Sequence, residues 1–217
     1  FTSADHRNIT NYINLRWKQI QKQSKEKNAG YYAATKNGNV YMSLAKRKNR
    51  RMWAWVHLLH KSGIRPQEAV GLMWNDIGLR HDAANNVNLC EIRITEENSK
   101  TNRSRIEYST ASKGESDLYE ILMKWKSHSL YQNDADYIFS KVIRDDVSKQ
   151  APLMYRYFSR MISTVINDYN DQNPESKLYS LTRDAEGREY SSYSYRHMYA
   201  TRLLTQGVNS YHLCEMM

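Results

Sequence analysis

Apolar residues recur every three or four positions along much of the chain, the spacing that lines one face of a helix. In the opening stretch, Ile9, Tyr12 and Ile13 form such a face, with lysine and arginine residues opposite. Capping residues and prolines mark several helix starts. The predicted helices are 2–20, the stretch from Met52 to Leu59 that Gly63 ends, those starting at Pro66, Ser116 and Pro152, the stretch 192–207, and a last one starting at Asn209 or Ser210.

Two parts of the chain depart from helical spacing. Val87 to Thr95 is rich in valine, leucine and isoleucine and predicts a strand, with Ile106 and Tyr108 on a returning strand. The polar residues 21–39 contain the turn pair Asn37-Gly38 and predict a loop or a short hairpin. The pattern therefore predicts an α+β fold, mostly helical, with one small antiparallel sheet. No internal repeat or linker divides the chain, so residues 1–217 are expected to form a single domain.

Composition indicates a folded, basic protein. With 217 residues, 40% of them apolar, the chain is long enough for a sizeable core. Its formal charge of +9 favours a polyanionic partner, most often nucleic acid, although a merely soluble basic protein has the same charge. Cys90 and Cys214 are too few for a disulfide framework, and a reducing cytoplasm fits best. No apolar run of about 18 residues predicts a membrane span, and Phe1 resembles a trimmed start rather than a signal peptide.

Basic residues are concentrated just before the second predicted helix. The run of five in six positions is Lys46, Arg47, Lys48, Arg50 and Arg51. Such a run is either a solvated helix face or a track that binds DNA phosphates. Farther along this helix His57 and His60 lie three positions apart, but no third ligand accompanies them, so no metal site is predicted.

A tight corner follows this helix. Gly63 ends the helix and Pro66 starts the next, which places Arg65 between them. An arginine in such a corner is either a structural strut or a ligand for two oxygens of one phosphate.

A basic turn joins the two predicted strands. It reads SKTNRSR from Ser99 to Arg105, with Lys100 near the tip, and Arg103 and Arg105 after it are predicted to bind DNA. An exposed lysine on a hairpin is ordinary, so this turn alone does not indicate a function.

The stretch 192–207 carries a second candidate anion site. Arg196 and His197 are placed where the helix should start, and free backbone N–H groups at a helix start favour an anion. Met198, Thr201 and Leu204 form the expected buried stripe. Solvation or capping is the ordinary alternative for the arginine–histidine pair.

Three motifs, in this order and spacing, resemble the catalytic domain of the tyrosine recombinases, the phage integrase family. They are GIRPQEAVGLMWNDI from Gly63, SKTNRSR from Ser99 and YSYRHMYATRLLTQG from Tyr193. The resemblance covers nearly the whole chain and implies a mostly helical catalytic domain with one small sheet. It also implies that this chain lacks the separate core-binding domain.

The resemblance assigns site roles residue by residue. The implied residues are Arg65 as first catalytic arginine, Glu68 as its acidic support, Lys100 as hairpin lysine, Arg196 as second arginine and His197 as the histidine after it. The sequence departs from the family at Tyr193, where a histidine is usual. The nucleophilic tyrosine is expected beyond Met217, because Tyr211 comes too soon after Arg196.

These roles suit DNA cleavage and rejoining. Two arginines can hold the non-bridging oxygens of a phosphodiester, and a lysine can protonate the departing 5′-oxygen. A covalent 3′-phosphotyrosine conserves the bond energy, so the resemblance implies neither metal nor nucleotide cofactor. The implied function is site-specific recombination of double-stranded DNA by a homotetramer in a prokaryotic cytoplasm, without small-molecule substrate. The alternatives are a DNA-binding module that does not cleave and a type IB topoisomerase-like enzyme.

Overall fold

The computed structural model describes residues 3–26, 32–34, 40–42, 44–84, 86–110, 117–143, 146–175, 191–211 and 213. Its helices are α1 (Ser3–Glu26), α2 (Leu44–Ser62), α3 (Pro66–Gly71), α4 (Leu118–Lys126), α5 (Tyr155–Gln172) and α6 (Ser192–Thr205), with a short 3₁₀ turn at Trp74–Asp76. Its strands are β1 (Tyr32–Ala34), β2 (Val40–Met42), β3 (Ile77–Asp82), β4 (Val87–Ile94), β5 (Arg105–Thr110), β6 (Ser140–Ile143) and β7 (Asp146–Pro152). The described chain is therefore mostly helical, as the sequence predicts.

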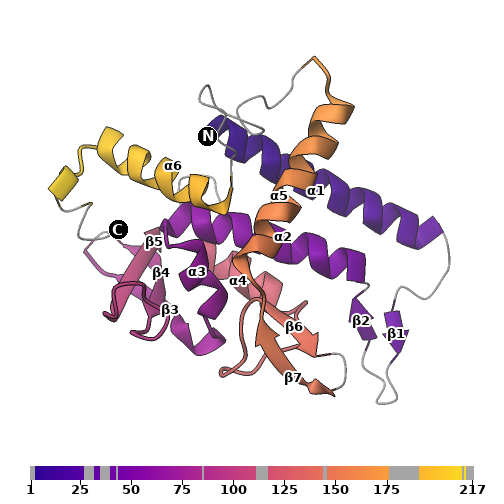
Figure 1. The fold of residues 1–217 in the computed structure, drawn as a ribbon, viewed down its shortest axis with the longest axis horizontal. Helices are drawn as coiled ribbons and strands as arrows, with labels where there is room; N and C mark the ends of the chain where they lie inside the picture. The colour runs from indigo at the N-terminus through magenta and orange to yellow at the C-terminus, as the bar shows by residue number, and fades with distance from the viewer. Residues whose placement is uncertain are drawn as a thin grey trace.

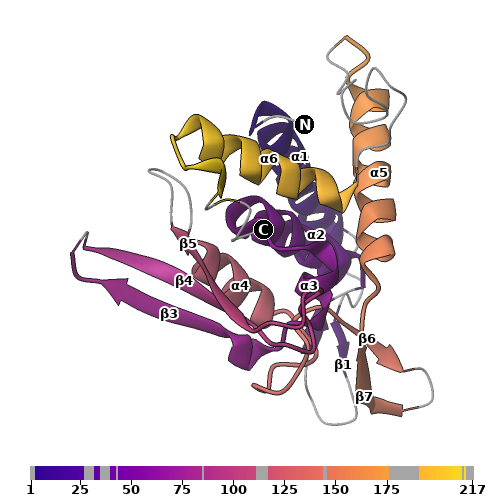
Figure 2. The ribbon, with the colours of Figure 1, turned by 60° about the vertical axis from the view of Figure 1, so that its left-hand side comes forward.

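Helix α2 runs through the middle of the molecule. In both views it lies between α1 and α6 on one side and α4 with the strands β3–β5 on the other (Figure 1, Figure 2). Its residues Trp55, Val56 and Leu59 are fully buried, as their helical spacing predicts. The Trp55 ring stacks on Phe158 of α5 with 3.9 Å between centroids and meets Phe139 edge-on. This aromatic packing fixes α2 in the middle of the fold.

In the described part of the chain, three antiparallel sheets accompany the helices. Strands β3, β4 and β5 form the sheet in that order, while β1 pairs with β2 and β6 with β7. The β1–β2 pair confirms the short-hairpin alternative for residues 21–39, although the strands are preceded by six further residues of α1. Strand β3 and the β6–β7 pair were not predicted, because their polar sequences lack clear alternation.

Two predicted helix starts are corrected. Pro152 is the last residue of β7 rather than the start of α5, whose N-cap is Met154. A proline is tolerated at the end of an edge strand, where its missing N–H breaks no ladder bond. Asp117 caps α4 by accepting a 2.6 Å hydrogen bond from Tyr119 N, whereas Ser116 lies outside the described residues. At the end of the described chain, Asn209 Oδ1 accepts from Tyr211 N at 2.8 Å, as its predicted capping role requires.

None of the helices in the described ranges is long and apolar enough to span a bilayer.

Candidate functional site

The corner between α2 and α3 orients Arg65. Gly63 adopts φ +65, a left-handed conformation that glycine takes without strain, and it turns the chain out of α2. Arg65 is the N-cap of α3, and Pro66 is its first residue. Glu68 accepts hydrogen bonds from both the backbone N and Nη1 of Arg65, at 2.9 and 3.0 Å. One carboxylate therefore fixes the orientation of Arg65, while its guanidinium stays partly exposed.

Glu68 also accepts from Arg105, at the start of β5. Arg105 Nη1 and Nη2 donate to the two Glu68 oxygens at 3.0 and 2.7 Å, and its Nε donates to Glu107 at 2.7 Å. Burial raises the pKa of Glu68, but hydrogen bonds from Arg105 and Arg65 outweigh burial and hold it below the usual value. Burial raises the pKa of Glu107, and Arg105 offsets only part of that rise. Sequence reasoning missed Glu107 and placed Arg105 on the exposed basic turn.

Arg196 reaches the same corner from α6. Its Nη1 donates to the carbonyl oxygen of Gly63 at 2.6 Å, and the residue is 8% exposed. Burial, followed by repulsion from the Arg65 charge, lowers the pKa of Arg196 to about 10. Two guanidinium groups thus face one region, where a bound anion would relieve their repulsion. We call Arg65, Glu68, Arg105, Glu107 and Arg196 the arginine cluster.

The predicted position of Arg196 and His197 at the start of α6 is wrong by about one turn. Ser191 is the N-cap and accepts from Tyr193 N, so Arg196 and His197 lie in the second turn, away from the free N–H groups. Thr201 and Leu204 are exposed rather than buried. The buried face of α6 comprises Ser192, Tyr195, Arg196, Met198 and Tyr199. Met198 is buried as predicted, but Arg196 is buried beside it because its guanidinium donates to the Gly63 carbonyl, which the apolar spacing could not reveal.

The structure separates the other predicted site residues. His197 is exposed, whereas its neighbour Arg196 is buried. Tyr193 is 36% exposed on the first turn of α6, with its ring edge-on to Tyr155. Lys100 and Arg103 lie exposed on the turn between β4 and β5. That turn is tied to α3 by a hydrogen bond of 3.0 Å from Asn98 Nδ2 to the carbonyl of Gly71.

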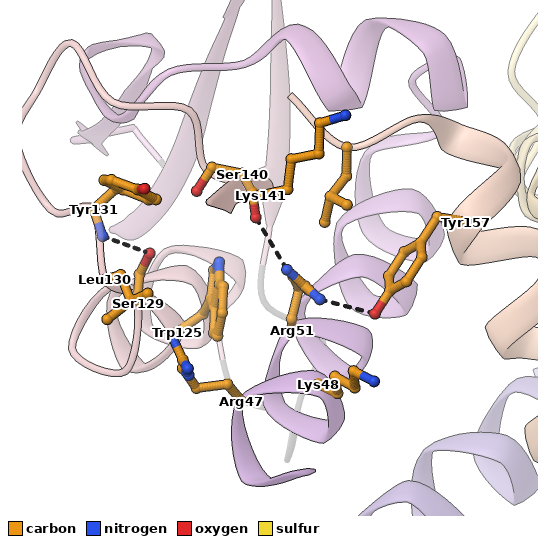
Figure 3. Close-up of a pocket in the computed structure, with 11 residues that line it drawn as sticks. Arg47, Lys48, Arg51, Trp125, Ser129, Leu130, Tyr131, Ser140, Lys141 and Tyr157 are labelled. Carbon is orange, nitrogen blue, oxygen red and sulfur yellow. Dashed lines mark hydrogen bonds between the residues drawn. The ribbon is translucent and has the colours of Figure 1, made fainter. Parts of the chain in front are cut away.

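The basic run at the start of α2 divides between two faces. Arg47, Lys48 and Arg51 line an open cavity of about 300 Å³, to which α4, β6 and α5 also contribute lining residues (Figure 3). Arg51 donates to the Ser140 carbonyl at 3.0 Å and to the Tyr157 hydroxyl at 2.8 Å. Burial lowers its pKa, and no carboxylate of the described residues pairs with it. We call this cavity the basic pocket.

Arg50 points away from the basic pocket. Its guanidinium lies over the Trp17 ring, 4.0 Å from the centroid, and 5.2 Å from that of Trp53. The side chain of Lys46 lies outside the described residues. Of the predicted phosphate track, the described side chains that line the basic pocket are therefore Arg47, Lys48 and Arg51.

His57 and His60 meet a third histidine from α1. The His6 ring stacks on His60 at 3.6 Å between centroids and lies edge-on to His57 at 5.4 Å. Burial, and then the charges of His60 and His57, hold the pKa of His6 well below its ordinary value. Stacked rings cannot direct their nitrogens at one ion, and no metal-binding group of three was found in the described part of the chain.

Comparison with known proteins gives a family and a fold. The family model described as phage integrase family matches residues 39–217. Among curated proteins, none matches the sequence. The XerH recombinase bound to difH substrate in a pre-cleavage complex matches 100% of this chain and 46% of its own, with 15% identity and a TM-score of 0.58. The XerH post-cleavage complex with palindromic difH matches 96% and 42%, with 15% identity and a TM-score of 0.56.

A third solved structure, the XerA recombinase, matches 82% of this chain and 54% of its own, with 19% identity and a TM-score of 0.50. The chain thus spans about half the length of the recombinases whose fold it shares.

Proposed function

Because the chain belongs to the phage integrase family, we propose that it is the catalytic domain of a tyrosine recombinase. In this proposal the natural polypeptide that contains this domain cleaves and rejoins double-stranded DNA at defined sites through a covalent 3′-phosphotyrosine. The observation that carries the proposal is the arginine cluster, where Arg65 and Arg196 converge on the corner at Gly63. The XerH structures are complexes with a difH substrate before and after cleavage, which supports DNA as the substrate of this chain.

The two arginines bind the phosphate that reacts. Attack by a tyrosine places extra negative charge on the non-bridging oxygens, and Arg65 and Arg196 stabilise that charge from fixed positions. Their fixation comes from the Glu68 carboxylate and the Gly63 carbonyl, so little reorganisation is needed during the reaction. Repulsion between the two guanidinium groups also makes this site favour an anion.

The remaining roles extend this site. Lys100 protonates the leaving 5′-oxygen from its exposed turn, a position from which a flexible side chain can reach bound DNA. Tyr193, three residues before Arg196, replaces the family's usual histidine as a hydrogen-bond donor to phosphate. His197 has a supporting role beside Arg196. Along the DNA, Lys48, Arg47 and Arg103 contact backbone phosphates, and the protein works as a homotetramer on DNA in a prokaryotic cytoplasm.

A suicide substrate tests the proposal. A nicked duplex that loses a short fragment after cleavage should trap a covalent protein–DNA adduct, in the natural polypeptide that contains residues 1–217. Mass spectrometry of the adduct then identifies the tyrosine. DNA binding with no adduct would favour the non-cleaving module. An adduct that relaxes supercoils but never joins two sites would favour the topoisomerase alternative.

A further inference from the structure

We propose that Arg105 is a positioning residue that fixes the Lys100 turn to the corner holding Arg65. The inference rests on the function proposed above and assigns Arg105 a role other than DNA contact. Arg105 is the first residue of β5 and follows Lys100 by five positions. Three of its donors are engaged by carboxylates, two by Glu68 and one by Glu107. An arginine held in this way has little freedom to follow a DNA backbone.

Glu68 links the two halves of the site. The same carboxylate accepts from Arg65 and from Arg105, although the latter comes from a strand 37 positions later in the chain. Its side chain is 1% exposed, so water cannot replace either partner. The place of the β5 start relative to Arg65 is therefore set by one buried ion pair with two parallel hydrogen bonds.

The orientation of β5 supports a role in the site rather than in the core. Arg105, Glu107 and Ser109 face inward, while Ile106 and Tyr108 are 47% and 36% exposed. Burying two charged residues and exposing two apolar ones costs stability in comparison with the reverse orientation. A strand that accepts this cost places its charges where the arginine cluster needs them.

The Lys100 turn depends on such anchors. Lys100 itself is exposed, so its reach toward the phosphate is set by where the turn lies. On the β4 side, Asn98 Nδ2 donates to the Gly71 carbonyl at 3.0 Å. On the β5 side, Arg105 makes the bidentate bond to Glu68. Both anchors end on α3, the helix whose N-cap is Arg65, so the proposed general acid and the proposed phosphate ligand share one support.

The test uses two suicide substrates that differ in the leaving atom. Arg105→Lys keeps the charge but loses the bidentate geometry. With an ordinary phosphodiester, its single-turnover cleavage should fall about 10- to 100-fold, a sizeable part of what a general acid contributes. With a 5′-bridging sulfur, the thiolate leaves without a proton, so the loss should shrink to within about threefold. DNA affinity should stay within about twofold of that of the unaltered protein.

Three variants serve as controls. Lys100→Ala should show the same rescue by sulfur, and Arg65→Lys should be slow on both substrates. Arg93→Lys, an exposed arginine on β4 of the same sheet, should cleave both substrates at the unaltered rate. Circular dichroism and thermal unfolding establish that each variant is folded. If Arg105→Lys is unfolded, Asn98→Ala releases the other anchor of the turn. That variant should then cleave the ordinary phosphodiester more slowly and the 5′-bridging sulfur substrate at a nearly unaltered rate.

The outcomes separate the possibilities. Equal loss on both substrates would overturn the positioning role, because Arg105 would then act through Arg65 or through the fold. Reduced DNA affinity with an unchanged cleavage rate would make Arg105 a DNA contact, as the basic turn in the sequence suggests. If Arg105→Lys is unfolded and Asn98→Ala cleaves at the unaltered rate, the positioning role of Arg105 is likewise overturned. Absence of any adduct with the unaltered protein would refute the proposed function instead.

Discussion

The two ends of α2 hold arginines in opposite ways. At its C-terminal end, Arg65, Arg105 and Arg196 surround two buried glutamates and a backbone carbonyl. At its N-terminal end, Arg51 is held by a carbonyl and a tyrosine hydroxyl, and Arg50 by two tryptophan rings. Among the described residues, no carboxylate pairs with either of these two.

The two ends of α2 therefore suit different tasks, one that needs a fixed geometry and one that needs only positive charge. Carboxylate pairs fix a guanidinium in one orientation, which a reaction centre requires because its transition state occupies one position. Arginines without carboxylates keep their positive potential available at long range, which attracts a polyanion without choosing one phosphate. We therefore expect substitutions at the C-terminal end to change rate or stability, and those at the N-terminal end to change salt-dependent affinity.

The largest effect is expected from Arg65 and Arg196, the two arginines proposed to bind the reacting phosphate. Arg65→Lys and Arg196→Lys keep the charge but lose the planar fork that bridges two oxygens. Each should slow cleavage about 100- to 1,000-fold, the usual cost of one preorganised donor, with DNA affinity nearly unchanged. Single-turnover cleavage and gel-shift titration measure the two quantities. Should either variant unfold, that arginine is a strut rather than a phosphate ligand.

The second effect concerns stability at the two ends. Glu68→Gln removes the charge shared by Arg65 and Arg105 and should lower the free energy of unfolding by about 3 kcal/mol, as for other broken buried pairs. Tyr157→Phe removes one neutral acceptor from Arg51 and should cost only about 1 kcal/mol. Urea unfolding of both variants gives the comparison. Equal losses would show that the carboxylate adds no special rigidity to the arginine cluster.

The third effect lies between the two ends, where α2 meets the histidines. The pKa of His6 is depressed in the folded protein, so the unfolded chain binds this proton at higher pH than the folded chain does. Stability is therefore complete above about pH 6.5 and falls as the pH drops below it, by up to about 1.4 kcal/mol per pH unit. His6→Phe keeps the ring on His60 and should flatten this dependence.

Thermal unfolding between pH 5 and pH 8 measures this pH dependence of stability. His81→Asn, at an exposed position on β3, is the matched control and should keep the slope. A slope that survives His6→Phe would assign the acid sensitivity to other groups.

The smallest effect is expected in the basic pocket. Replacing Arg47 and Lys48 with alanine should reduce the slope of log K against log salt by about 0.9 for each lost phosphate contact. Arg50→Ala should change the slope less, because its guanidinium lies over Trp17 and Trp53. DNA binding at several salt concentrations measures the slopes. An unchanged slope in the double variant would make this run a solvated helix face.

The sequence predicted local features well where chain neighbours determine them. The corner at Arg65 needs only Gly63, Pro66 and Glu68, all within six positions, and each is placed as expected. The mostly helical fold follows from apolar spacing, as Trp55 and Leu59 illustrate.

Prediction failed where polar residues are buried by distant partners. Apolar spacing assigned Thr201 and Leu204 of α6 to the core, yet Arg196 is buried instead because Gly63 accepts its hydrogen bond. On β5 the same rule treats Arg105 as exposed, although Glu68 on α3 holds its guanidinium inward. Glu107 is buried beside it as the second carboxylate partner of Arg105. A pattern read along the chain cannot contain a partner that only folding brings close.

The bond between Arg196 and Gly63 also has a consequence for how the chain folds. It joins residues 133 positions apart, and the contact between Trp55 and Ser192 spans 137. Contacts this distant in sequence form slowly, because a long loop must close before they contribute any stability. During synthesis α2 leaves the ribosome well before α6, so the hydrophobic core around α2 can begin to assemble first. The arginine cluster is completed only when α6 docks and brings Arg196 to the corner at Gly63.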